Sequence, residues 1–253
     1  MHFLLANDDG IAAIGLKALS RAVTERGHSL VICAPQTQQS AASHHVTLTA
    51  PIIMREVPWE DENVKAYSIK GTPVDCVRIA QMLTDKPFDF VFSGINDGDN
   101  AGTSIYYSGT VSAAREARML NLPAMAVSIR THADEEMRMN LARLAVRIAE
   151  RFQGNVLPRL CLINLNAPAI PVSHLKPLRI APLSDAYYLD SYERRVSPHG
   201  DVYFWLESGL KIEPHKPGTD MALLNEGHVV CTFIGGMTDH NAACAGILQD
   251  LCI

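Results

Sequence analysis

The sequence predicts an α/β protein whose central sheet is mostly parallel and covered by helices on both sides. Short apolar segments alternate with stretches of helical periodicity over the first 169 residues of this 253-residue chain, a pattern typical of βαβ units. The later apolar segments are hydrophobic almost without interruption, as strands buried on both faces are. Two neighbouring carboxylates, Asp8 and Asp9, follow the first segment, at the edge where open α/β sheets carry their sites.

The predicted elements alternate along the first two thirds of the chain. Apolar runs predict strands at 2–6, 29–33, 65–70, 89–93, 123–128 and 160–164. Apolar residues spaced three and four apart predict helices at 14–25, 73–83, 110–119 and 134–152. We therefore expect a core domain at 1–169.

Beyond this core the composition changes. Prolines recur, and side chains alternate from Tyr187 to Trp205 around Pro198-His199-Gly200, which predicts a β-hairpin. We interpret 170–216 as a hairpin arm or oligomerisation extension, and 217–253 as a segment that returns to the core. An isolated two-stranded hairpin is marginal in water, so this one is expected to pack on something.

Composition narrows the class of protein. The formal net charge is −5 without any basic run, which argues against a nucleic-acid partner. No apolar run approaches the length of a membrane span and no leader pattern precedes the first strand. The cysteines are scattered without a CxxC pair, which predicts reduced core thiols and a cytoplasmic protein. They are Cys33, Cys76, Cys161, Cys231, Cys244 and Cys252.

The acidic turn at Asp8 and Asp9 is the first candidate site. Two adjacent carboxylates at the end of a buried strand repel each other and lose hydration, and a bound cation compensates both effects. The alternative is that Asp9 caps the helix predicted at 14–25. That explains one aspartate but not two, so we favour a metal site.

Two further loops fall on the same sheet edge. The segment from Ser93 to Gly102 places Asn96 among three glycines, which allow close backbone approach to a ligand. The loop after the second strand contains Ser40 and Ser43, whose hydroxyls are candidate metal or phosphate ligands. His44-His45 lacks zinc spacing, so we interpret the pair as substrate-facing or solvated.

Two helix starts carry hydroxyl groups. Ser108, Gly109 and Thr110 open the helix predicted at 110–119 and offer hydroxyls and backbone N–H groups to an anion, although an ordinary N-cap explains the same residues. Thr72, followed by Pro73 and Asp75, has the pattern of a capping box. We assign that second start a mainly structural role.

In order and combination, these segments resemble the SurE (survival protein E) family of metal-dependent nucleotidases. The resemblance covers essentially the whole chain. It lies in Asn7-Asp8-Asp9-Gly10, Ser40-Ala41-Ala42-Ser43, Gly71-Thr72-Pro73-Val74-Asp75-Cys76, Ser93-Gly94-Ile95-Asn96, Tyr107-Ser108-Gly109-Thr110-Val111, Ser197-Pro198-His199-Gly200 and Thr219-Asp220.

The resemblance implies a Rossmann-like, three-layer α/β/α core and a homodimer or homotetramer built with C-terminal arms. It implies hydrolysis of nucleoside 5′- and 3′-monophosphates and, in some members, shortening of polyphosphate. It also implies one divalent cation per subunit, with Asp8, Asp9, Ser40 and Asn96 as its ligands. Such an all-oxygen set favours Mg²⁺ or Mn²⁺ over zinc.

The expected chemistry is attack of metal-activated water on the phosphate. Asp8 and Asp9 are then the catalytic candidates, and Asn96, Ser108, Gly109 and Thr110 the phosphate- and substrate-binding ones. The chain lacks a GxGxxG or GxxxxGK[ST] segment, and its aspartates are adjacent, unlike those of haloacid-dehalogenase-type phosphatases. A module that senses nucleotide or metal without turnover is the non-enzymatic alternative.

Overall fold

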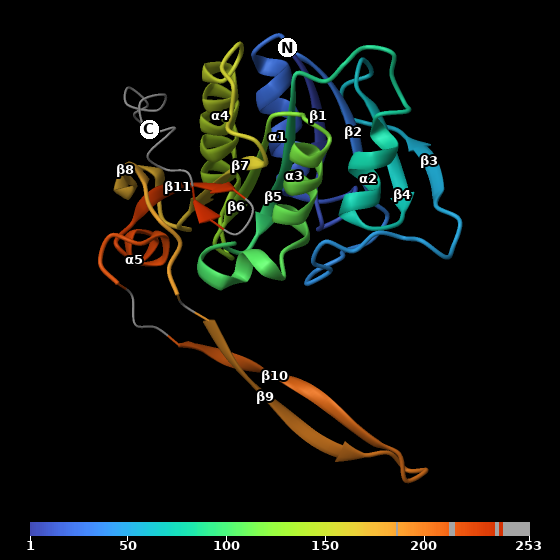
Figure 1. The fold of residues 1–253 in the computed structure, drawn as a ribbon, viewed down its shortest axis with the longest axis vertical. Coiled ribbons are helices and arrows are strands. Elements are labelled where there is room, and N and C mark those ends of the chain that lie inside the picture. The colour runs from blue at the N-terminus through green and yellow to red at the C-terminus, as the bar shows by residue number, and fades with distance from the viewer. Residues whose placement is uncertain (186, 213–215, 236–237, 240–253) are drawn as a thin grey trace.

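The central sheet is the dominant feature of the molecule (Figure 1). The computed structural model describes residues 1–185, 187–212, 216–235 and 238–239, and ten strands within these ranges form one sheet. Their order is β12-β11-β7-β6-β5-β1-β2-β4-β3, with β8 beside β11. The six predicted strands form its centre: β1 (His2–Ala6), β2 (Ser29–Pro35), β4 (Lys65–Lys70), β5 (Phe90–Asp97), β6 (Ala124–Ile129) and β7 (Cys161–Ala167). Neighbours among these six are all parallel, which confirms the predicted sheet.

The four predicted helices cover the two faces of the sheet (Figure 1). One face carries α1 (Ile14–Glu25) and α4 (Glu135–Arg151), and the other α2 (Pro73–Ala80) and α3 (Gly109–Met119). Strand β1 divides its side chains between these layers, because successive residues of a strand point to opposite faces. Phe3 and Leu5 belong to the core under α1 and α4, whereas Leu4 and Ala6 belong to the core under α2 and α3. The three-layer α/β/α architecture is therefore confirmed.

The helix starts test the capping interpretations. Thr72 and Asp75 exchange side-chain-to-backbone hydrogen bonds and form the predicted capping box. Ser108 caps α3 with its hydroxyl. Helix α1 begins after Ala13 and has no side-chain cap, so the interpretation of Asp9 as a helix cap is wrong.

Several elements add to the predicted set. They are β3 (Ile53–Val57), η1 (Gly102–Tyr106), η2 (Val172–His174), β8 (Lys176–Ile180), α5 (Asp220–Asn225), β11 (His228–Gly235) and β12 (Thr238–Asp239). Strands β3 and β8 are largely exposed and therefore lack a continuous apolar run. Strand β11 is buried and pairs antiparallel with β7, so part of 217–253 adds to the main sheet.

The predicted hairpin consists of β9 (Tyr187–Val196) and β10 (Val202–Ile212), which pair antiparallel. It projects away from the sheet (Figure 1). The range 170–216 also contains β8, which pairs with β11 in the main sheet. The Ser184 N–H group bonds to Asp220 of α5. The part that leaves the main body is therefore the hairpin itself.

Four of the cysteines are buried free thiols, as expected: Cys33, Cys76, Cys161 and Cys231. Cys244 and Cys252 lie outside the described residues. Across the described ranges, no helix has both the length and the apolar character needed to cross a membrane.

Candidate functional site

A cavity of about 560 Å³ lies at the carboxyl edge of the central strands. The loops after β1 and β2, the end of β5, the turn into α3 and the hairpin form its walls. Five predicted site residues line it together: Asp8, Asp9, Ser40, Asn96 and Ser108. The other lining residues are Gln38, Ala41, Asp97, Asn100, Thr103, Ser104, Tyr107, Tyr187, Asp190 and Leu206.

Asp8 is a buried acid with 5% of its surface exposed. The hydroxyl and the backbone N–H of Thr110 both donate hydrogen bonds to its carboxylate. Burial and, less strongly, the charge of Asp9 raise the pKa of Asp8 to about 6, against the lowering effect of the Thr110 hydrogen bonds. The hydrogen bonds that the protein supplies therefore offset only part of the cost of ionising Asp8 in a buried position.

Asp9 lies in a similar environment. Its Oδ2 accepts the Asp97 N–H at 3.1 Å, and its Oδ1 lies 3.5 Å from Gln38 Nε2. Burial raises the pKa of Asp9 and the charge of Asp97 adds to this, whereas the Asp97 N–H and the more distant Arg138 lower it. Arg138 reaches Asp97 rather than Asp9, with Nη2 3.2 Å from Asp97 Oδ1.

Ser40 and Asn96 supply neutral oxygen atoms beside these acids. Gln38 Nε2 donates to Ser40 Oγ at 2.9 Å. Asn96 Nδ2 donates to the Gly98 carbonyl at 2.7 Å, which leaves Oδ1 as the acceptor of that amide. The four side chains thus offer hard oxygen atoms with two negative charges, a donor set that fits Mg²⁺ or Mn²⁺. No group of three His, Cys, Asp or Glu side chains suited to a metal occurs among the described residues.

The start of α3 faces Asp8. Ser108 lines the cavity, and its Oγ accepts the Val111 N–H at 3.0 Å. Thr110 is fully buried and its hydroxyl is directed to Asp8, so that hydroxyl is not on the cavity wall. A Cβ atom at Gly109 would lie 2.8 Å from the Cβ atom of Asp8. Glycine is therefore the residue that lets this helix approach the acid.

Some cavity residues were not predicted. Gln38 and Asp97 contact the acidic turn and lie inside loops that the sequence already marked as polar, so their residue type was the available signal. Tyr187, Asp190 and Leu206 come from the hairpin. No local pattern connects them with the acidic turn, because their approach depends on how the hairpin leaves the body.

The interpretation of His44 as substrate-facing or solvated is wrong. Its Nε2 donates to Glu116 Oε2 at 2.7 Å, and the Glu116 side chain is 2% exposed. His45 is exposed, and its carbonyl accepts the Thr72 hydroxyl at 2.7 Å. The histidine pair thus holds the loop after β2 against α2 and α3.

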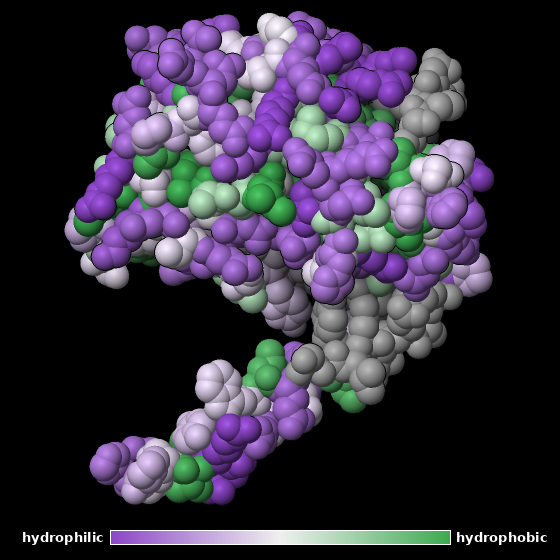
Figure 2. Space-filling model, turned by 180° about the vertical axis from the view of Figure 1, so that it is seen from behind, coloured by the Kyte–Doolittle hydropathy of each residue, from purple (hydrophilic) through white to green (hydrophobic). Residues whose placement is uncertain are grey.

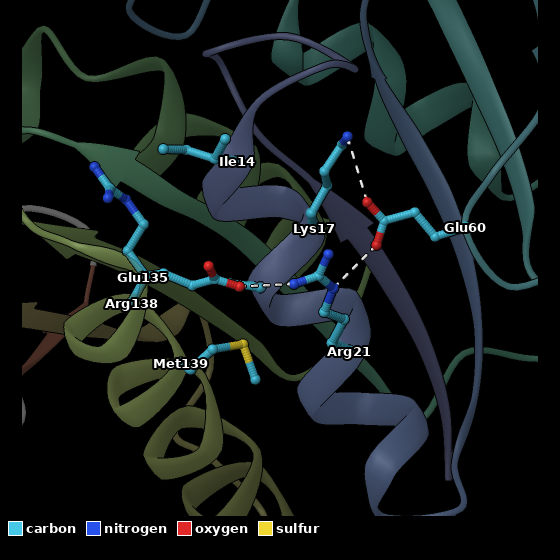
Figure 3. Close-up of a pocket in the computed structure, with 8 residues that line it drawn as sticks. Ile14, Lys17, Arg21, Glu60, Glu135, Arg138 and Met139 are labelled. Atoms are coloured by element: carbon cyan, nitrogen blue, oxygen red, sulfur yellow. Dashed lines mark hydrogen bonds and ion pairs between the residues drawn. The ribbon is translucent and has the colours of Figure 1, made fainter.

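A second cavity of about 330 Å³ lies between α1 and α4 (Figure 3). Glu60 binds both Lys17 Nζ at 3.4 Å and Arg21 Nε at 3.0 Å. Arg21 Nη1 also lies 2.9 Å from Glu135. The acids of this cavity are therefore neutralised by cations of the protein.

Known proteins resemble this chain over nearly its full length. A family model described as survival protein SurE matches residues 3–190. The 5′-nucleotidase SurE of Desulfovibrio desulfuricans is 41% identical over 253 residues and covers 97% of both chains. That of Nitratidesulfovibrio vulgaris is 40% identical over 244 residues, or 96% of this chain and 90% of the relative. The crystal structure of the SurE protein from Aquifex aeolicus matches with a TM-score of 0.78 at 30% identity, covering 98% of each chain.

The fold, the acidic site and these relatives define an α/β enzyme of the phosphoric monoester hydrolase class. The crystal structure match confirms the Rossmann-like architecture independently. The chain belongs to the SurE family, because the family model spans most of it and the relatives cover it almost from end to end. The resemblance found in the sequence motifs is thereby confirmed.

Proposed function

We propose that this chain is a divalent-metal-dependent nucleotidase that hydrolyses nucleoside 5′-monophosphates, and also 3′-monophosphates, to nucleoside and phosphate. The observation that carries the proposal is the pair Asp8 and Asp9, which share one cavity with Ser40, Asn96 and Ser108. Burial raises the pKa of both aspartates, so a cation would supply the compensation that the protein lacks. The relatives carry the name 5′-nucleotidase SurE, which supports nucleoside monophosphates as substrates.

The cavity residues divide into two roles. Asp8, Asp9, Ser40 and Asn96 would hold one Mg²⁺ or Mn²⁺ ion. When bound, this ion would polarise a phosphoryl oxygen and promote attack by water. Ser108 and the adjacent first turn of α3 would orient the phosphate, aided by the positive end of the helix dipole.

We assign the nucleophile to water, without a phosphoenzyme. Asp8 already accepts hydrogen bonds from Thr110, and a second role in metal binding would reduce its nucleophilicity further. No cysteine is among the residues that line the described cavity. One aspartate of the pair is our candidate to take the proton from the water. A chiral, isotopically labelled phosphorothioate ester should therefore be hydrolysed with inversion at phosphorus, and retention would indicate an intermediate on Ser108.

Phosphate release from adenosine 5′-monophosphate tests the proposal. The purified chain should release phosphate, lose this activity in chelator, and regain it with Mg²⁺ or Mn²⁺. Full activity after metal removal, or restoration by zinc alone, would contradict the proposed site. Binding of the nucleotide without turnover would instead indicate a sensing module. The 3′-monophosphate and polyphosphate, run in parallel, define the range of substrates.

We further propose that the hairpin contacts a second copy of the chain, in a homodimer or homotetramer. Six apolar or aromatic side chains described on it are more than half exposed: Leu189, Tyr192, Val196, Phe204, Trp205 and Leu206. Figure 2 shows the hairpin standing clear of the body with hydrophobic groups on its surface. Sedimentation should find an oligomer at micromolar protein, and a monomer would contradict this assignment.

Two smaller assignments complete the proposal. We take 1–169 as the metal- and phosphate-binding core, the hairpin of β9 and β10 within the predicted extension 170–216 as the arm, and 217–253 as the returning segment. We place the protein in the cytoplasm, since its four described cysteines are buried free thiols of the kind that a reducing compartment maintains.

A further inference from the structure

Glu116 is a buried acid outside the cavity whose contacts join three segments. Its Oε2 binds His44 Nε2 at 2.7 Å and its Oε1 binds Arg78 Nε at 2.6 Å. Glu116 lies on α3, Arg78 on α2, and His44 in the loop that follows β2. We call residues 36–47 the Ser40 loop.

The Ser40 loop has a conformation that needs support. Ala41 and Ser43 have φ angles of 57° and 51°, in the left-handed region that side chains other than glycine rarely adopt. Ser43 is held through its N–H, which donates to the Tyr107 carbonyl at 3.0 Å. His44, the next residue, is held by Glu116. Contacts at Ser43 and His44 therefore help to keep the loop in its observed shape.

Helix α3 also holds the acidic turn. Thr110, in its first turn, donates to Asp8, and Glu116, nearly two turns further along, binds the Ser40 loop. Helix α3 thus fixes the position of Asp8 relative to Ser40 from one side, while the Gln39 N–H donates to the Asp8 carbonyl at 2.7 Å from the other. Both Asp8 and Ser40 line the cavity. Loss of the Glu116 contact would loosen the Ser40 loop at His44, while the backbone contacts of Gln39 and Ser43 and the Thr110 contact stay in place.

We infer that Glu116 is a positioning residue that acts through His44. It fixes the Ser40 loop relative to Asp8 and thereby sets how tightly the site holds its divalent cation, an inference that rests on the proposed function. Glu116 and His44 are not among the residues that line the cavity, so neither is assigned a catalytic role. Preorganised ligands bind more tightly because less ordering remains to be done on binding.

The chain contains a matched control for this arrangement. Glu150 also joins a histidine and an arginine, with His28 Nε2 at 2.9 Å and Arg26 Nη2 at 2.8 Å. His28 directly precedes β2, so the group of Glu150, His28 and Arg26 lies at the amino edge of the sheet, opposite the cavity. Glu150→Gln and His28→Ala therefore remove the same chemistry far from the cavity.

The test compares Glu116→Gln and His44→Ala with these two controls. In the metal-free Glu116→Gln and His44→Ala variants, hydrogen exchange in a peptide covering residues 38–45 should be roughly tenfold faster than in wild type. Tenfold is roughly the scale of one lost hydrogen bond to a charged group. Equilibrium dialysis with Mn²⁺ alone should show binding weakened by about the same factor. At saturating Mn²⁺, kcat for adenosine 5′-monophosphate should recover to near the wild-type value. Both controls should keep wild-type exchange and Mn²⁺ affinity.

His44→Ala keeps the test decisive if Glu116→Gln does not fold, because His44 is partly exposed and Arg78 still compensates Glu116. Wild-type exchange and Mn²⁺ affinity in His44→Ala would overturn the inference, as would equal losses in the controls. If the wild-type protein binds Mn²⁺ but releases no phosphate, the proposed activity fails while the exchange and dialysis results still decide the role of Glu116.

Discussion

The cavity between α1 and α4 and the cavity at the carboxyl edge of the sheet are both lined by carboxylates. The surroundings of these carboxylates shift their pKa values in opposite directions. Between α1 and α4, hydrogen bonding to Arg21 lowers the pKa of Glu60. At the carboxyl edge, burial raises the pKa of Asp8 to about 6, and no ion pair to Asp8 or Asp9 occurs among the described residues. Acids that the protein neutralises itself hold elements together. Acids that it buries without a cation are suited to bind one from solution.

The largest expected difference between the cavities is in activity. Asp8→Asn or Asp9→Asn keeps the side-chain volume but removes one of the two charges that would bind the cation. We expect kcat/KM for adenosine 5′-monophosphate to fall on the order of a hundredfold or more, as for loss of a preorganised electrostatic group. Metal titrations of the variants should show weakened binding. Near-normal turnover in Asp9→Asn would mean that Asp9 is not a ligand.

The second expected difference is in the stability of the metal-free protein. The pKa of Asp8 is raised in the folded state from 3.8 to about 6, so folding binds protons between these values. The stability of metal-free protein therefore falls as pH rises through this window, and the full penalty remains at higher pH. Asp8→Asn removes this penalty for ionising a buried acid. The free energy of unfolding at pH 7.5 should therefore rise by an amount on the order of 2 kcal/mol.

Urea unfolding in chelator at pH 7.5 and pH 4 measures this change. The gain of Asp8→Asn over wild type should shrink towards zero near pH 4, because wild-type Asp8 is then protonated in the fold. A variant that is less stable than wild type at pH 7.5 would show that the Thr110 hydrogen bonds outweigh burial, contrary to the balance described for this acid.

The neutral residues of the carboxyl-edge cavity should matter less than the acids. Ser40→Ala and Asn96→Ala each remove one uncharged oxygen, so we expect losses in kcat/KM of about tenfold, the scale of a single polar contact. A higher Mn²⁺ concentration should restore part of the activity of each variant. Losses equal to those of Asp9→Asn would show that charge is not what distinguishes the acids from their neutral neighbours.

The same contrast explains what the sequence could predict. The sequence predicted several buried elements to the residue, among them the strands at 2–6 and 65–70 and the helix at 14–25. In such elements apolar residues recur at the spacing of a strand or helix, and this pattern can be seen within a short stretch of sequence. The edge strands β3 and β8 were missed because their side chains are mostly exposed. Burial, rather than strand formation as such, is what the sequence records most clearly.

Site residues follow a similar rule. The sequence predicted that Asp8, Asp9 and Asn96 lie at one sheet edge, and they line one cavity. Their residue types stand at strand ends, and parallel strands bring those ends together. The contact between His44 and Glu116 joins residues 72 positions apart. It depends on how the Ser40 loop packs on α3, and no local pattern contains that information, so His44 was interpreted wrongly.

The smallest expected effect belongs to the cavity between α1 and α4. Glu60→Gln breaks the ion pairs with Lys17 and Arg21, whose side chains are 39% and 48% exposed. Exposed pairs of this kind contribute little, since water and salt already screen the charges. We expect kcat/KM to stay within about twofold of wild type, and 1 M salt to reduce any difference in thermal stability between the two. A loss of activity approaching that of Asp9→Asn would show that this cavity is coupled to the site, and the contact between Arg138 and Asp97 would be the first connection to examine by substituting Arg138.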